Sequence, residues 1–147
     1  MSYIRNVELS DAEVLVEIYR PYVENTAISF ECETPSVDEF RSRIENISKK
    51  YPYIVMVEDD EIVGYAYAGR FKGRKAYDWC VETTIYVRED KKGGGYGKKL
   101  YLELEKRLKK QNILNMYACI AYTDNVDEHL TNNSMQFHEH MGFRLIG

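Results

Sequence analysis

"VREDKKGGGYGKKLYLELEKRL", residues 87–108, places four glycines within five positions, flanks them with lysines and continues into a helix-like stretch. Leucines recur at helical spacing at positions 100, 104 and 108, so the sequence predicts a helix over residues 98–110. Glycine is favoured where backbone approaches a ligand closely, and a helix N-terminus behind such a turn directs amide N–H groups at one point. The stretch therefore predicts a turn that binds a phosphate or pyrophosphate. The alternative is a surface turn beside a solvated lysine-rich helix.

Two common nucleotide-binding loops are excluded by the spacing of these glycines. A Walker A loop ends in Gly-Lys-Ser or Gly-Lys-Thr, whereas Gly97-Lys98 is followed by Lys99, and Lys92 stands where the first glycine belongs. The Rossmann fingerprint that could start at Gly93 would require a glycine at position 98. Only the simpler strand, glycine turn and helix arrangement remains.

Composition and charge describe one ordinary globular domain. The chain has 147 residues, of which 44% are hydrophobic and 30% charged, and its net charge is −4. An acidic balance argues against a nucleic-acid partner. The opening residues lack the apolar core of a signal peptide, and no stretch approaches the length of a membrane span, so we expect no membrane partner.

The cysteines indicate a reducing compartment. Cys32, Cys80 and Cys119 are odd in number, widely spaced and form no C-x-x-C pair. This usage predicts reduced thiols in the cytoplasm, without a disulfide framework and without a metal site.

The order of elements predicts an α/β (α+β) fold. Two helices are expected to begin at capping boxes, Ser10 with Glu13 and Ser36 with Glu39, and a hairpin is expected at the acidic turn 59–60. The full order is strand, two helices, three antiparallel-type strands, helix, strand, helix, strand. This order predicts a mixed central sheet flanked by four helices.

Three segments resemble one enzyme superfamily. "KGGGYG" resembles the Q/R-x-x-G-x-G/A motif of the GNAT superfamily of N-acetyltransferases, with Lys92, Gly95 and Gly97 in the defining places. Residues 69–89, "GRFKGRKAYDWCVETTIYVRE", and residues 133–143, "NSMQFHEHMGF", are similar to segments of its phosphinothricin acetyltransferase-like branch. The resemblance covers nearly the whole chain, and it implies the GNAT fold, with a mostly antiparallel, splayed sheet.

The chain departs from that family pattern in two places besides its end. Lys92 replaces the usual Arg or Gln, which keeps the charge but loses the forked guanidinium geometry. The loop "TDNVDEHLTNNS" is longer than is usual in the branch. The family asparagine beside the cofactor therefore corresponds to Asn133, or alternatively to Asn125 or Asn132.

The resemblance implies acetyl-CoA as cosubstrate and no metal. Its pyrophosphate would lie on the amides of the glycine loop, and its pantetheine arm would pair with β-type backbone like an extra strand. The amide of Val87 would polarise the thioester carbonyl. The cofactor-binding residues implied in this way are Ile85, Tyr86, Val87, Lys92, Gly93, Gly94, Gly95, Tyr96, Gly97, Lys98, Asn133 and Ser134.

Two residues are the catalytic candidates. Strict alternation places Glu82 and Thr84 on one face of the strand and Val81 and Thr83 on the other. An acid in such an apolar strand is costly unless it is used or paired. By resemblance Glu82 is the base that deprotonates the amine; the alternative is a partly exposed glutamate on an open sheet face. His138 occupies the place where many relatives carry a tyrosine that protonates the leaving thiolate, and its alternative role is packing or capping.

The predicted reaction is direct acetyl transfer to the amine of a small amino-acid-like substrate of the phosphinothricin or methionine sulfone type. The expected acceptor-binding residues are Phe30, Arg74, Tyr77, Trp79 and Glu82. Arg74 is expected to hold the carboxylate of the substrate, because arginine binds carboxylates through two parallel hydrogen bonds.

Rival functions are a non-catalytic acetyl-CoA-binding domain and a peptide or protein N-terminal acetyltransferase.

The resemblance also bears on the end of the chain and on assembly. Relatives continue past the Gly-Phe pair with a further strand, so residues 1–147 form one N-acetyltransferase domain that either lacks this last strand or obtains it otherwise. Relatives of the branch commonly form homodimers. An exposed strand edge after residue 143 would favour pairing with another chain, so we expect a homodimer.

Overall fold

One five-stranded sheet organises the molecule. The computed structural model describes residues 2–24, 33–70, 80–91, 94–111, 113, 115–118, 138, 141 and 143. The strands lie in sequence order, the first four antiparallel and the fifth parallel to the fourth. They are β1 (Ser2–Asn6), β2 (Tyr53–Glu58), β3 (Glu61–Arg70), β4 (Cys80–Val87) and β5 (Asn115–Ala118).

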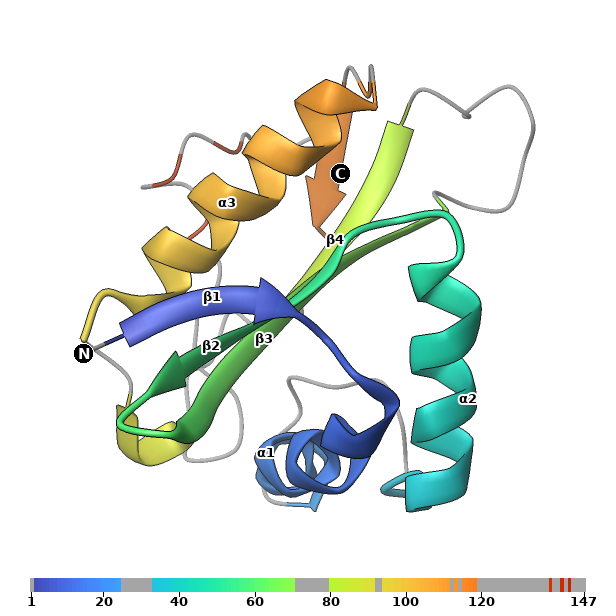
Figure 1. Ribbon diagram of the computed structural model, residues 1–147, viewed down its shortest axis with the longest axis vertical. Helices are drawn as coiled ribbons and strands as arrows, with labels where there is room; N and C mark the ends of the chain where they lie inside the picture. The colour runs from blue at the N-terminus through green and yellow to red at the C-terminus, as the bar shows by residue number, and fades with distance from the viewer. Residues whose placement is uncertain are drawn as a thin grey trace, which may run out of the picture.

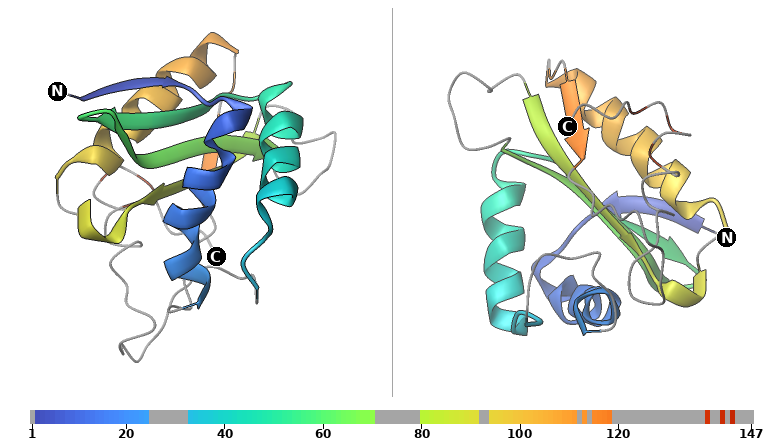
Figure 2. Two further views of the ribbon diagram at one scale, coloured as in Figure 1. Left: turned by 60° about the horizontal axis from the view of Figure 1, so that its bottom comes forward. Right: turned by 180° about the vertical axis from the view of Figure 1, so that it is seen from behind.

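Helices cover both faces of this sheet. Figures 1 and 2 show α1 (Ala12–Glu24) and α2 (Val37–Ser48) on one face, and α3 (Tyr96–Lys110) on the other. Short 3₁₀ helices, η1 (Leu9–Asp11) and η3 (Glu89–Lys91), precede α1 and follow β4. The described residues contain three α-helices where the sequence predicted four. The fourth falls on a segment of which His138 is described, and His138 is helical.

The starts of the helices test the predicted capping boxes. At α2 the prediction is confirmed, because the Ser36 hydroxyl accepts the Glu39 N–H at 3.1 Å. At α1 it is wrong, because Ser10 lies inside η1. The Asp11 carboxylate instead accepts the Glu8 N–H at 2.8 Å and binds Arg5 on β1 at 2.8 and 3.0 Å. A charge-assisted cap of this kind is stronger than one made by a neutral hydroxyl.

The predicted acidic turn is also confirmed. Asp59 and Asp60 join β2 to β3 with φ values of 50° and 66°, the left-handed backbone that matches the twist of a tight hairpin. The pairing that follows is regular from Gly64 to Arg70 against β4, so the register fixes which side chains share a face.

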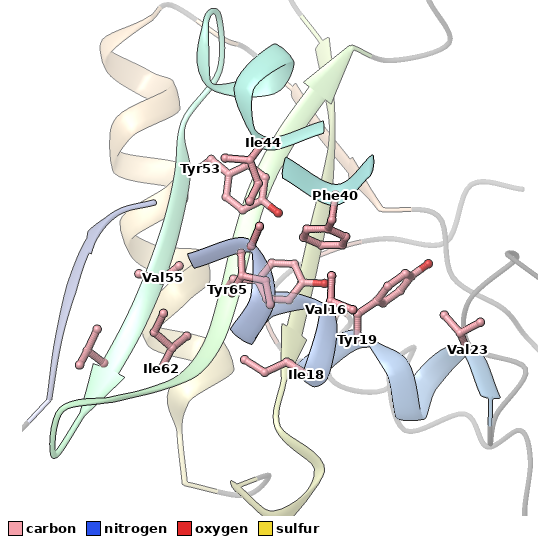
Figure 3. Close-up of a cluster of buried hydrophobic side chains, with 13 residues drawn as sticks. Val16, Ile18, Tyr19, Val23, Phe40, Ile44, Tyr53, Val55, Ile62 and Tyr65 are labelled. Atoms are coloured by element: carbon pink, nitrogen blue, oxygen red, sulfur yellow. The ribbon is translucent and has the colours of Figure 1, made fainter. Parts of the chain in front are cut away.

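The core between the sheet and helices α1 and α2 combines aliphatic side chains with a set of stacked aromatic rings (Figure 3). Tyr53 and Tyr67 stack with ring centroids 4.6 Å apart. Tyr65 is fully buried, and its ring centroid lies 5.8 Å from that of Tyr86. Burial raises the pKa of Tyr65 well above its ordinary value, so its hydroxyl stays neutral. We call this group the tyrosine cluster; its members are Tyr19, Tyr22, Tyr53, Tyr65, Tyr67 and Tyr86.

The second core lies between the sheet and α3. The predicted leucine stripe is confirmed, since Leu100, Leu104 and Leu108 are all buried. Small residues on the facing strand let the helix approach closely: Ala66 and Ala68 of β3 are both fully buried in the same cluster. The sheet is thus packed on both faces over its central part.

Candidate active site

The glycine loop leads into the start of α3 as predicted. α3 begins at Tyr96, and the preceding Gly95 has φ 81° and ψ 6°, a left-handed conformation suited to glycine. The Lys99 N–H binds the Gly95 carbonyl at 3.2 Å and so closes the first turn. The amides of residues 96–98 precede that bond and have no intrahelical acceptor. A helix start without a capping side chain offers these N–H groups and the positive end of the helix dipole to an anion.

Gly94 has a local reason to be glycine. A Cβ at this position would lie 2.8 Å from the Tyr96 ring, so the ring occupies the space that a side chain would need. At Gly95, by contrast, no described atom lies within 4 Å of an added Cβ. Among the described residues, the open side of the loop is therefore the side of Gly95.

The second component of the site is the edge of β4 that faces β5. β5 pairs with β4 only over residues 80–83 among the residues that the structure describes. The Arg88 N–H binds the Val63 carbonyl at 2.8 Å, and bonded pairs alternate along an antiparallel ladder. The backbone groups of Tyr86 therefore face β3, and those of Ile85 and Val87 face the edge beyond β5.

One of these edge groups already has a partner. The Tyr22 hydroxyl, from α1, donates to the Val87 carbonyl oxygen. Both backbone groups of Ile85 and the N–H of Val87 point to the same edge and have no strand partner in the described part of the chain. Two of the three strand residues predicted for the cofactor thus present backbone there. The ring of Tyr86 packs in the tyrosine cluster.

Glu82 stands on the α1/α2 face of β4. It pairs with Gly69 on β3, and it shares this face with Thr84 and with Tyr86 of the tyrosine cluster. Glu82 is half-buried. The alternation predicted from sequence is confirmed, because Val81 packs in the core on the α3 face.

His138 lies on the opposite face of the sheet. Its side chain is 5% exposed, and its Nε2 is 2.5 Å from the Tyr101 hydroxyl of α3. The Tyr101 hydroxyl is also 3.3 Å from the Thr83 hydroxyl on β4, and the Phe143 ring lies 5.2 Å from the imidazole. Burial raises the pKa of Tyr101, so this hydroxyl remains a neutral hydrogen-bonding group. β4 therefore separates the two catalytic candidates.

Sequence reasoning missed three of these contacts. The sequence analysis did not single out Tyr22 or Tyr101, and Gly69 appeared only within the family-like segment 69–89. The signal at Thr83 and Tyr101 was a polar group on an otherwise apolar face, which is costly when buried without a partner. That signal shows that a partner exists but does not identify it.

Several predicted site residues cannot be placed. The structure does not describe Phe30, Arg74, Tyr77, Trp79, Lys92, Gly93, Asn133 and Ser134, nor the alternatives Asn125 and Asn132.

The described residues contain neither a metal-binding cluster nor a membrane-spanning helix. No group of three or more His, Cys, Asp or Glu side chains there is arranged to hold a metal ion. None of the helices in that part of the chain is long and apolar enough to cross a membrane.

We predict that Tyr101→Phe destabilises the protein by about 1–3 kcal/mol, because His138 and Thr83 both lose a buried hydrogen-bonding partner. Urea unfolding measures this difference. Tyr3→Phe is the matched control, since Tyr3 is 50% exposed and its change should cost less than about 0.5 kcal/mol. Equal stability of the two variants would contradict the buried hydrogen-bond chain.

Known proteins are similar to this chain in fold and in sequence. A phosphinothricin N-acetyltransferase of Streptomyces viridochromogenes is 30% identical over 98% of this chain and 75% of its own length. An L-methionine sulfoximine/L-methionine sulfone acetyltransferase of Pseudomonas aeruginosa is 29% identical over 98% and 81%. A phosphinothricin acetyltransferase of Sinorhizobium meliloti, solved with acetyl-CoA, superposes with a TM-score of 0.88 at 32% identity, over 99% of this chain and 76% of that one. The model of the acetyltransferase (GNAT) domain matches residues 4–147. The chain therefore belongs to the GNAT acetyltransferase family.

Proposed function

We propose that this protein is an acetyl-CoA-dependent N-acetyltransferase that acetylates the amino group of a small amino-acid-like acceptor by direct transfer. The observation that carries the proposal is a pair of backbone donor groups on either side of the glycine loop. These are the edge of β4 at Ile85 and Val87 and the uncapped start of α3. Glu82 lies on the same strand, half-buried, a few residues from that edge.

The pyrophosphate, the pantetheine arm and the thioester of acetyl-CoA would each bind one of these backbone groups. The pyrophosphate would accept from the amides at the start of α3, with the Lys98 side chain nearby and exposed to solvent. The pantetheine amides would exchange hydrogen bonds with the Val87 N–H and the Ile85 carbonyl, as an added strand does. The thioester carbonyl oxygen would then accept from the Ile85 N–H and not, as expected from the sequence, from that of Val87, because Val87 lies roughly 16 Å from Glu82 along the strand. Lys92, Gly93, Asn133 and Ser134 remain predicted contacts of the cosubstrate.

Acetyl transfer needs a neutral amine, and this is the role proposed for Glu82. The Glu82 carboxylate accepts a proton from the ammonium group of the acceptor, directly or through water. The nitrogen then attacks the thioester carbonyl, and the Ile85 N–H stabilises the negative oxygen that forms. Collapse of this intermediate breaks the carbon–sulfur bond and leaves the amide product and the thiolate of CoA.

His138 is proposed as the group that protonates the thiolate. Its Nε2 is bonded to Tyr101, so a proton given to the sulfur would leave from Nδ1. Glu82 and His138 lie on opposite faces of β4, which would let the acceptor and the leaving thiolate be served from two sides of the strand. A purely structural His138 would instead affect stability and not the pH dependence of thiol release.

The acceptor class follows from the names of the relatives. Those proteins are acetyltransferases of phosphinothricin and of methionine sulfoximine or sulfone, which are small α-amino acids. We propose an acceptor of the same chemical type. Arg74 would bind its carboxylate through a bidentate pair, and Phe30, Tyr77 and Trp79 would surround its side chain.

A free-thiol release assay tests the proposal. Acetyl-CoA is supplied with methionine sulfone, methionine sulfoximine, phosphinothricin, ordinary amino acids or peptides. We expect amine-dependent thiol release with the first three and little with peptides. Stabilisation by CoA in a thermal-shift experiment without turnover of any amine would establish the rival, a non-catalytic acetyl-CoA-binding domain.

We further propose that the protein is a cytoplasmic homodimer. The resemblance to its branch supports the dimer, and the odd, widely spaced cysteines support a reducing compartment. Light scattering over a dilution series measures the assembly. A monomer at micromolar concentration would contradict the dimer.

A further inference from the structure

Gly69 occupies an interior position of a strand, where glycine is unfavourable and needs a reason. Glycine there loses more conformational entropy than other residues and has no side chain to pack. Its φ lies outside the left-handed range, in contrast to Gly95, so the backbone does not require glycine. No described atom lies within 4 Å of a Cβ built at Gly69, so packing of the described residues does not require it either.

Gly64, on the same strand, shows what a packing glycine looks like. A Cβ at Gly64 would lie 3.0 Å from the Tyr86 carbonyl oxygen and 3.3 Å from side-chain atoms of Leu100 and Val87. Gly64 is therefore fixed by the approach of α3 and β4. The two glycines are five positions apart and differ completely in their surroundings.

The space over Gly69 adjoins the proposed base. Gly69 pairs directly with Glu82, and the alternation of bonded pairs makes this a hydrogen-bonded pair. Side chains at such positions stand on the same face with Cβ atoms roughly 4.5–5.5 Å apart. The next pair on the same face, Tyr67 with Thr84, leads into the stacked rings of the tyrosine cluster. Among the residues that the structure describes, rings fill this face up to Tyr67, and no atom lies over Gly69 beside Glu82.

We propose that Gly69 is a specificity-determining residue that leaves room beside Glu82 for the substituted carbon of the acceptor. This inference rests on the proposed function. An α-amino acid carries its nitrogen on a carbon with two further substituents, and these need space when the nitrogen reaches the carboxylate. Glycine as acceptor has only one such substituent. A side chain at position 69 would thus exclude α-amino acids that carry a side chain on the α-carbon more strongly than it would exclude glycine.

Gly69→Val and Gly69→Ala, with Gly64→Ala as control, test this role. Gly69→Val should keep the melting temperature and the acetyl-CoA affinity of the parent. It should lower kcat/KM for methionine sulfone by at least about 10–200-fold, the usual effect of a single methylene in a pocket, because valine adds three carbons, and it should lower kcat/KM for glycine less. Gly69→Ala should show a smaller change in the same direction. Gly64→Ala should lower the melting temperature and leave the ratio between the two acceptors unchanged.

The outcomes separate this inference from the proposed function. A parent protein that acetylates amines and a Gly69→Val variant with an unchanged acceptor ratio would overturn the role of Gly69 alone. Loss of acetyl-CoA affinity or of folding in Gly69→Val would also overturn it, because the residue would then serve the cosubstrate or the core. A parent that releases no thiol with any amine would remove both proposals.

Discussion

Replacing Glu82 by glutamine is expected to lower amine-dependent turnover at neutral pH by about 10²–10⁴-fold, the usual contribution of a positioned proton acceptor. The amide keeps the size and the hydrogen-bonding capacity of the side chain but cannot take a proton. Fold and acetyl-CoA affinity should be unchanged. The Glu82 side chain is half-buried on the α1/α2 face of β4, whereas the cosubstrate would bind backbone groups at the edge of this strand. Steady-state kinetics with methionine sulfone, together with calorimetry for acetyl-CoA, measures both quantities.

The pH dependence sharpens this test. An amine is mostly protonated at neutral pH and increasingly free at high pH, so the defect of Glu82→Gln should shrink as the pH rises. Glu61→Gln is the matched control, because Glu61 also lies on a strand of the sheet but its side chain is 67% exposed. If Glu82→Gln turned over the acceptor as fast as Glu61→Gln at neutral pH, Glu82 would be an ordinary surface glutamate.

Replacing Gly95 by valine should weaken acetyl-CoA binding at least 100-fold, on the order of 3 kcal/mol. The left-handed φ of 81° disfavours a β-branched residue, and the side chain would project into the open side of the loop that leads to the amides of α3. Isothermal calorimetry with acetyl-CoA and with CoA measures the loss.

Gly95→Asn separates these two causes. Asparagine tolerates the left-handed conformation, so it removes most of the strain while still placing a side chain in the same space. If the cosubstrate lies over Gly95, both variants lose affinity. If only strain matters, Gly95→Asn binds like the parent, and unchanged affinity in Gly95→Val would remove the loop from the site.

Local pattern was sufficient to predict most elements of the fold. The buried stripe of α3, the Ser36 cap and the acidic hairpin turn each depend on residues a few positions apart, and all three are confirmed. The start of α1 was mispredicted because the Glu8 N–H is capped by the Asp11 carboxylate, which is also paired with Arg5 of β1. A pattern of capping residues does not contain that ion pair.

The candidate site was predictable in type but not in detail. Alternation alone placed Glu82 and Val81 on different faces of β4, and the structure confirms it. Which backbone groups face the open edge depends on which pairs are bonded, and this requires the register with β3. The bond between Tyr101 and His138 joins residues 37 positions apart, and no spacing rule in the sequence connects them.

A crystal structure with a bisubstrate analogue, in which CoA is linked to the nitrogen of an α-amino acid, tests the central claim most directly. We expect the pyrophosphate on the amides of residues 96–98, the pantetheine along the edge of β4 at Ile85 and Val87, and the linked nitrogen beside Glu82 above Gly69. An analogue bound along another edge of the sheet, or with its nitrogen away from Glu82, would contradict the account.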